Sequence, residues 1–331
     1  MDDLIQLPRR DALRLAALTG LCAATVVLPP ARADAAVPAP TGEQAPGFYR
    51  FKVGSFEITS LIDGPITLTP VSILATNASE DELRKLLTEN FLASDAANIF
   101  TNVMLVNTGR NLVLIDAGGG RWQPTTGRLL DNLRAAGIDP ADVDTIVISH
   151  GHLDHLWGVT DEQTGTVNFP NATVFLSETE WALWGNPESA SSFPEELRWL
   201  LEGSVRTLQR VADRVEPFKP GAEIVSGIAT ADAAGHTPGH AAILVESDGE
   251  LLLCPADTAV HPVVSCAHPE WHFGFDMDPD KAITTRRHFL DWAATDRLLT
   301  TAYHMPFPGL GHVARDGGVY RWVQEPWRWS L

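Results

Sequence analysis

The sequence feature that most constrains this fold is a run of metal-binding side chains directly after an apolar segment. Residues 143–149 are predicted to form a buried strand, which is followed by His150, His152, Asp154 and His155. Neutral imidazole and carboxylate are ligands that suit Zn²⁺ and related first-row metals. His150 and His152 alternate, so both can point to one metal. Asp154 and His155, on the following turn, can point to a second.

Three later segments carry the same kinds of side chain at or after the end of a predicted strand. The sequence Ala-Gly-His-Thr-Pro-Gly-His offers His236 and His240, the strand over 251–254 leads to Asp257, and the strand over 298–303 leads to His304. Together these residues supply about the number of ligands that a two-metal site needs. A carboxylate can bridge two metal ions about 3.5–4 Å apart, and Asp257 is the candidate for that position.

The rest of the pattern predicts an α/β chain in which helices cover mixed sheets. A capping box at Ser79 starts one predicted helix, and the strand over 298–303 is the last clear one. Strands are expected over 51–63, 103–108, 111–116, 143–149, 173–177, 224–232, 241–246, 251–254 and 298–303. Helices are expected over 80–91, 127–136, 194–214 and 278–294.

Composition excludes several classes of protein. The 331 residues are 44% apolar, which is enough for a large core and argues against a disordered chain. Acidic residues outnumber basic ones by 42 to 24, which gives a formal charge of −18 and argues against binding to nucleic acid or anionic lipid. Three cysteines are too few for a disulfide scaffold or a four-cysteine zinc site.

The first 33 residues are typical of a secretory signal peptide. The pair Arg9-Arg10 precedes an apolar run over 13–28, and Ala31-Arg32-Ala33 resembles a cleavage site. The two arginines indicate the Tat export machinery as a partner, with cleavage near Ala33 and a periplasmic or secreted product that is not inserted in the membrane. Residues 34–46 are expected to form a linker, and 47–331 a single catalytic domain.

The order of these motifs resembles that of the metallo-β-lactamase superfamily. Its members carry His-x-His-x-Asp-His, then Gly-His-Thr-Pro-Gly-His, then an Asp and a His at later strand ends. The segment that begins His304-Met-Pro-Phe-Pro-Gly, together with Tyr320-Arg-Trp-Val, is similar in particular to the methyl parathion hydrolases. The resemblance implies a metallo-β-lactamase-type αβ/βα sandwich, that is, two mixed sheets covered by helices, and allows a homodimer.

The resemblance also implies a division of the ligands between two divalent metal ions, with zinc the expected metal. The first ion would be held by His150, His152 and His236, and the second by Asp154, His155 and His304, with Asp257 between them. In this family the ligand is the histidine of Gly-His-Thr, which is His236 here. His240 is therefore expected behind the ligands, although it remains the alternative ligand. Asp116 in Ile-Asp-Ala-Gly would orient a ligand imidazole, unless it serves only a structural turn.

The expected function is that of an exported dinuclear hydrolase. Two metal ions would lower the pKa of a bridging water, whose hydroxide attacks a neutral phosphotriester, aryl ester or lactone, with Asp257 and Asp154 as candidate catalytic residues. The alternatives are a β-lactamase or other amide hydrolase, a mono-iron oxygenase, and a binding module with a decayed site.

Substrate contacts and cysteine pairing are the least constrained features. Four aromatic residues are expected to line an apolar pocket, with ordinary core packing as the alternative: Trp122, Trp181, Trp184 and Phe193. Export would permit a disulfide between Cys254 and Cys266, but two buried free thiols explain the sequence equally well.

Overall fold

The computed structural model describes residues 44–331, of which Ala45–Leu331 form one compact unit. The predicted signal peptide (1–33) and residues 34–43 of the predicted linker lie outside the described residues. Within the described part of the chain, no helix has the length and apolar character needed to cross a membrane.

The first half of this unit builds a seven-stranded mixed sheet in sequence order. Its first four strands are antiparallel to their neighbours. The fourth strand and the three that follow it are parallel to one another. The strands are β1 (Phe48–Val53), β2 (Phe56–Leu68), β3 (Ala97–Asn107), β4 (Leu112–Ile115), β5 (Thr145–Val147), β6 (Thr173–Ser177) and β7 (Val215–Phe218).

The second half builds another seven-stranded sheet, ordered from β14 back to β8. All neighbours in it are antiparallel except β11 and β12. The strands are β8 (Glu223–Val225), β9 (Ile228–Asp232), β10 (Ala241–Ser247), β11 (Glu250–Cys254), β12 (Leu299–Thr301), β13 (Leu310–Asp316) and β14 (Val319–Gln324).

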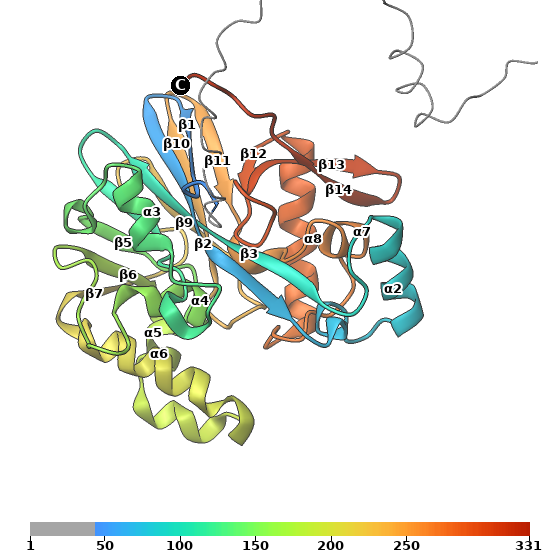
Figure 1. Cartoon of the computed structure of the whole chain (residues 1–331), viewed down its shortest axis with the longest axis horizontal. Coiled ribbons are helices and arrows are strands. Elements are labelled where there is room, and N and C mark those ends of the chain that lie inside the picture. The colour runs from blue at the N-terminus through green and yellow to red at the C-terminus, as the bar shows by residue number, and fades with distance from the viewer. Residues whose placement is uncertain (1–43) are drawn as a thin grey trace, which may run out of the picture. The chain divides into compact units, whose positions relative to one another are not determined.

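Helices cover the outer faces of the two sheets, so the predicted αβ/βα sandwich is confirmed (Figure 1). Helices α3 to α6 lie along the first sheet, and α7 and α8 lie beside the second. The helices are α2 (Glu80–Glu89), α3 (Leu129–Ala135), α4 (Leu153–Leu156), α5 (Glu178–Trp184), α6 (Arg198–Arg210), α7 (Val264–Ala267) and α8 (Pro279–Thr295). The capping box at Ser79 starts α2 as predicted.

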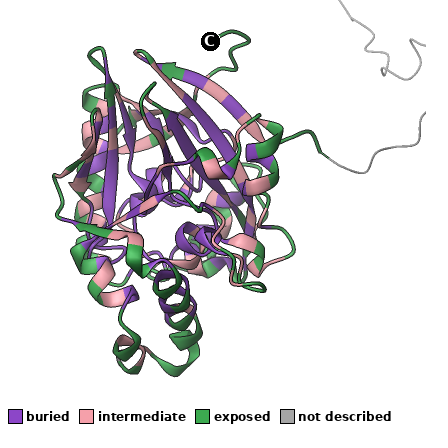
Figure 2. Cartoon of the chain, turned by 90° about the vertical axis from the view of Figure 1, so that its left-hand side faces the viewer, coloured by how far each residue is buried: buried purple, intermediate pink, exposed green. Residues whose placement is uncertain are grey.

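The core has one apolar layer between the sheets and one beneath the helices on each side. Ile58, Val106 and Ile243 belong to the central cluster, which joins the two sheets. Leu253 and Phe289 belong to the cluster under α8. Figure 2 shows buried residues concentrated on the strands and exposed ones on the outer helices. Strands buried on both faces carry continuous apolar runs, which explains why sequence pattern located β5 and β11.

The structure differs from the sequence prediction in several strands, and β7 was not predicted at all. Residues 224–232 form two strands, β8 and β9, because Gly227 adopts a positive φ of 84° and lets the chain reverse. Two further strands, β13 and β14, follow residues 298–303, which were predicted to form the last strand. They pair at the edge of the second sheet, where half-buried residues give no continuous apolar run.

Candidate metal centre

Four connections that follow strands bring the seven predicted ligands together. His150 and His152 follow β5, and Asp154 and His155 lie in the short helix α4 that continues the same connection. The other three ligands each follow a strand of the second sheet: His236 after β9, Asp257 after β11 and His304 after β12. The site therefore lies where the two sheets meet, and both halves of the chain contribute to it.

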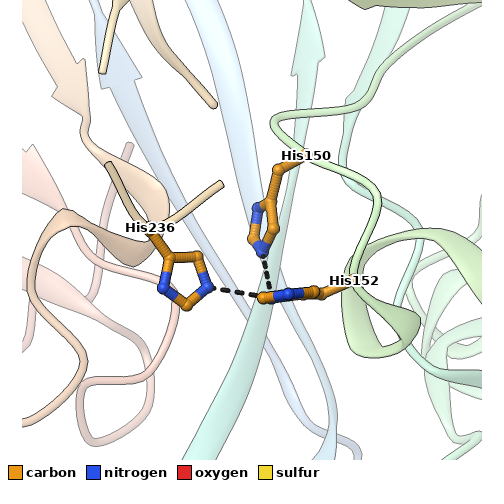
Figure 3. Close-up of side chains that lie close together, drawn as sticks. All are labelled: His150, His152 and His236. Atoms are coloured by element: carbon orange, nitrogen blue, oxygen red, sulfur yellow. Dashed lines mark hydrogen bonds between the residues drawn. The ribbon is translucent and has the colours of Figure 1, made fainter. Parts of the chain in front are cut away.

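Three imidazoles converge on one point (Figure 3). Nδ1 of His152 lies 3.1 Å from Nε2 of His150 and 2.9 Å from Nε2 of His236. These side chains come from both halves of the chain, and their nitrogens form one group of close potential ligand atoms. This is the set predicted to hold the first metal.

A second group forms beside the first. Oδ2 of Asp154 lies 3.6 Å from Nε2 of His155 and 3.5 Å from Nε2 of His304. These three residues are the set predicted to hold the second metal, and their ligand atoms again lie close together.

The carboxylate of Asp257 spans both groups. Its Oδ2 lies 3.3 Å from Nε2 of His236 and 3.1 Å from Nε2 of His304, while its Oδ1 lies 3.1 Å from Nε2 of His155. One carboxylate thus contacts ligands of each set, which is the geometry expected of a bridging ligand.

Hydrogen bonds at Nδ1 orient two of the imidazoles for metal binding. Nδ1 of His155 donates to Asp116 Oδ2 at 2.8 Å, and Nδ1 of His304 donates to the carbonyl of Phe100 at 2.6 Å. Because Nδ1 carries the proton, Nε2 is the unprotonated nitrogen that can bind a cation in the neutral ring.

Among the buried side-chain atoms of residues 44–331 that lack a hydrogen bond, two belong to predicted ligands. Nε2 of His155 and Oδ1 of Asp257 face each other, yet neither forms a hydrogen bond within residues 44–331. Buried polar atoms without partners are rare in native proteins and call for an explanation such as a bound ion. Imidazole nitrogens and carboxylates are the donor set for first-row divalent metals, so the residues present fit two such ions.

Electrostatics favours a cation at this position. Burial alone would raise the pKa of Asp257, but the facing imidazoles of His304 and His155 hold it well below its usual value. Burial alone would lower the pKa of His155, but Asp257 and Asp116 raise it well above its usual value. In His150 burial prevails and lowers the pKa well below normal, which keeps that ring neutral.

Asp116 and His240 lie behind the ligands. Asp116 accepts from His155 and also from the backbone N–H of Ser149 at 2.7 Å, so it fixes the start of the ligand loop. His240 donates from Nδ1 to the carbonyl of Ala233 at 3.0 Å, and its Nε2 accepts from the backbone N–H of Asp257 at 3.3 Å. Both of its nitrogens are thereby engaged, and the structure places it behind Asp257.

Three supporting residues were not foreseen from the sequence. Asp276 accepts from Nδ1 of His236 at 2.9 Å. Glu180, at the start of α5, accepts from the backbone N–H groups of Gly151 and Gly239 at 2.8 and 2.7 Å, and so joins two ligand loops. The hydroxyl of Tyr303 donates to the carbonyl of Asp154 at 2.6 Å. No local pattern identifies these partners, because each contact joins residues at least 29 positions apart.

A largely apolar cavity of about 260 Å³ opens onto the ligands. His152, Asp154 and Asp257 form part of its wall, and Trp122 lines it as predicted from the sequence. The apolar part of the lining comprises Ile66, Leu68, Ile73, Ile99, Trp122, Leu153, Leu197, Trp199, Leu200, Phe273 and Phe275. A larger, more polar cavity elsewhere contains none of the seven ligands.

The other three aromatic residues predicted for the pocket lie outside its lining. Trp184 is buried in the core, with its ring edge-on to that of His152 at a centroid distance of 5.3 Å. Phe193 contacts Trp184, and Trp181 packs against the same core cluster. Trp181 and Trp184 pack toward the core from α5, and Phe193 joins them from the segment that follows it. The unpredicted Trp199 and Phe273 line the cavity instead.

Cys254 and Cys266 are both buried and free in the described chain, so they do not form the permitted disulfide. Burial raises the pKa of each thiol to about 12. Neither is therefore a candidate nucleophile.

Comparison with known proteins agrees with this geometry. A family model described as the metallo-β-lactamase superfamily matches residues 97–296. The N-acyl homoserine lactonase AttM of Rhizobium radiobacter is 33% identical over 140 residues, which cover 39% of this chain and 46% of that enzyme. The matched region thus spans less than half the length of this curated relative.

Two solved structures are similar over most of the chain. AidC, a dizinc quorum-quenching lactonase in complex with a product, has a TM-score of 0.80 and 31% identity, covering 85% of this chain and 98% of its own. The hydrolase AbOPH of the β-lactamase superfamily also has a TM-score of 0.80, with 32% identity and coverage of 86% and 100%. The narrower resemblance to methyl parathion hydrolases stays a prediction.

Proposed function

Because this chain belongs to the metallo-β-lactamase superfamily, we propose that it is a dinuclear metal hydrolase of neutral esters, and of lactones in particular. The observation that carries the proposal is the carboxylate of Asp257, which contacts ligands of both groups at the base of an apolar cavity. The lactonases AttM and AidC support the choice of substrate class.

The seven side chains would hold two zinc ions, which when bound polarise the carbonyl under attack and lower the pKa of a bound water. The chain's own contribution is to fix the ligands. Asp116 and Asp276 accept the Nδ1 protons of His155 and His236, so that Nε2 of each ring faces Asp257.

Asp154 is the second candidate catalytic residue. Its side chain is 13% exposed, compared with 4% for Asp257, and it lines the cavity. A carboxylate that borders both the ligands and the substrate cavity is placed to carry a proton to the leaving oxygen. Tyr303 holds the backbone of Asp154 through the carbonyl, which limits its movement.

The cavity favours a neutral substrate over a charged one. Among the described residues that line it there is no lysine or arginine that could pair with a substrate carboxylate away from the ligands. β-Lactam antibiotics carry such a carboxylate, which argues against the β-lactamase alternative. The apolar wall suits a substrate with an alkyl or aryl group.

Turnover of a substrate panel by the zinc-loaded protein tests this proposal. The panel contains an N-acyl lactone, a simple lactone, an aryl ester, a phosphotriester and a β-lactam. We expect lactone turnover that is abolished in Asp257→Ala and retained in Asp213→Ala, whose side chain is 77% exposed on the surface. Turnover of the β-lactam alone, or lactone turnover unchanged in Asp257→Ala, would overturn the proposal.

Export is a separate proposal that rests on the twin-arginine segment of residues 1–33. We expect expression of the full chain in a Tat-competent bacterium to release a product that begins near Asp34. N-terminal sequencing of the released protein checks this, and an intact N-terminus in the cytoplasm would contradict it.

A further inference from the structure

Arg286 is a deeply buried cationic side chain near the metal centre that the proposed reaction does not use. It lies on α8, on the outer side of the second sheet, and is only 2% exposed. A guanidinium removed from water must be satisfied by hydrogen bonds or by an opposite charge, because an unpaired buried charge is strongly destabilising.

All partners of Arg286 belong to one segment, residues 258–276. Nε donates to the carbonyl of Thr258 at 2.9 Å. Nη1 donates to the carbonyls of Pro269 and Trp271 at 3.0 and 2.8 Å, and Nη2 donates to Oδ2 of Asp276 at 3.0 Å. One side chain thus fixes the beginning, the middle and the end of this segment, which we call the wall segment.

Each end of the wall segment adjoins the metal centre. Thr258 directly follows Asp257, and Asp276 accepts from Nδ1 of His236 with the oxygen that Arg286 does not contact. The backbone N–H of Met277 also donates to the carbonyl of His236 at 3.0 Å. A displacement of this segment would therefore move the hydrogen-bond acceptor of one ligand and the backbone next to another.

The same segment supplies part of the substrate cavity. Phe273 and Phe275 lie between Trp271 and Asp276, and both line the cavity. The ring of Phe273 stacks on His236 at a centroid distance of 5.9 Å. The backbone N–H of Phe273 donates to Oδ2 of Asp276 at 3.3 Å. The apolar wall and the orientation of the ligand therefore share one support.

We propose that Arg286 is a positioning residue that sets the orientation of His236 and the apolar wall of the cavity together. The substrate part of this inference rests on the proposed function, whereas the part that concerns metal retention and the wall segment does not. Lysine cannot replace the arginine fully, because its single ammonium group cannot reach all the carbonyls that lie on different sides of the planar guanidinium of arginine.

Two substitutions separate the effect on the apolar wall from the effect on the orientation of His236. Arg286→Lys keeps a positive charge that can pair with Asp276 but loses contacts with the backbone carbonyls. Asp276→Asn keeps an oxygen that can accept from His236 but loses the charge that strengthens both of its hydrogen bonds. The matched control is Arg287→Lys on the same helix, because Arg287 is 55% exposed and lies 3.7 Å from Glu270 of the same segment.

Three measurements on the full zinc-loaded protein test the inference. They are hydrogen exchange of peptides within residues 258–276, zinc retention against a chelator, and KM for a long-chain relative to a short-chain lactone. For Arg286→Lys we expect faster exchange in the wall segment, weaker zinc retention and a raised KM ratio. For Asp276→Asn we expect zinc affinity to fall by about 10- to 100-fold. Arg287→Lys should leave all three unchanged.

The inference is overturned if Arg286→Lys lowers thermal stability but leaves exchange, zinc retention and the KM ratio unchanged. Equal effects in Arg287→Lys would overturn it as well. Exchange and zinc retention require no substrate, so they test the inference even if the lactonase proposal fails. If Arg286→Lys does not fold, zinc retention in Asp276→Asn decides, and retention equal to that of the unmodified protein counts against the inference.

Discussion

Oδ2 of Asp116 lies 2.8 Å from Nδ1 of His155, and this contact turns Nε2 of the ring toward the metal centre. The position also needs an unusual backbone, because Asp116 has a φ of 61°. Aspartate and asparagine tolerate that left-handed conformation better than most residues. The sequence Ile-Asp-Ala-Gly therefore serves both the turn after β4 and the orientation of a ligand.

The first prediction concerns this contact. Asp116→Asn keeps a residue suited to the backbone and an oxygen that can accept from the N–H of Ser149, but its amide nitrogen cannot accept from His155. We expect zinc affinity to fall by about 10- to 100-fold while the fold is retained. Chelator competition measures the affinity, and circular dichroism checks the fold. Unchanged affinity in a folded variant would show that Asp116 serves only the turn.

The second prediction concerns the apolar wall. Trp199 lines the cavity but is 47% exposed, so its removal should disturb the core little. We expect Trp199→Ala to lower kcat/KM for a long-chain lactone by roughly tenfold or more, with a smaller effect on a short-chain lactone.

The matched control for Trp199 is Trp329→Ala, because Trp329 is 94% exposed and absent from the cavity lining. Steady-state kinetics on both lactones compares the two variants. An equal loss on both lactones, or the same loss in Trp329→Ala, would contradict a specific role for Trp199 in binding the chain.

The third prediction concerns pH and Asp63, a buried residue that accepts from the backbone N–H groups of Gly119 and Leu129 at 3.0 Å each. Burial raises the pKa of its carboxyl, so the folded state holds the proton to a higher pH than the unfolded state. The contribution of Asp63 to stability is therefore greatest below its unfolded pKa and declines as pH rises through the folded pKa.

Denaturation of metal-free protein at several pH values tests this sign against Asp63→Asn, which cannot ionise. The difference in free energy of unfolding between the two proteins removes the shared contributions of the metal ligands. We expect the free energy of unfolding of the unmodified protein to fall relative to that of Asp63→Asn as pH rises from about 4, the usual pKa of aspartate. A shift in favour of aspartate over the same range would contradict the raised pKa.

The fourth prediction concerns the two buried thiols. Burial raises the pKa of Cys254 and of Cys266 to about 12, so very little thiolate is present at pH 8. We expect both to resist alkylation in the native protein and to react after denaturation, as read by peptide mass spectrometry. Alkylation of either in the native state, or a disulfide-linked peptide without reduction, would contradict the buried free state.

The sequence was most informative where chemistry is local. The ligands His150 to His155 lie within six residues after an apolar strand, so their spacing alone indicated a metal centre. The paired sheets followed from the apolar runs and from the family resemblance. The edge strands β7 and β14 were missed because exposed and half-buried positions carry a weak pattern.

Long-range contacts could not be predicted in the same way. Asp276 lies 40 residues from His236, and Glu180 lies 59 residues from Gly239. Nothing in the sequence near either acid names its partner. The pocket aromatics show the same limit, because only the fold decides that Trp199 borders the cavity while Trp184 is enclosed in the core.

The most direct test of the account is a zinc titration of metal-free protein, with bound zinc and lactone hydrolysis followed in the same samples. Because Asp257 contacts both groups of ligands, we predict two tightly bound ions per chain, with hydrolysis rising until the second site is filled. In Asp257→Ala both tight binding and hydrolysis should be lost. Full hydrolysis at one equivalent of metal, or two tight ions retained in Asp257→Ala, would contradict a centre bridged by this carboxylate.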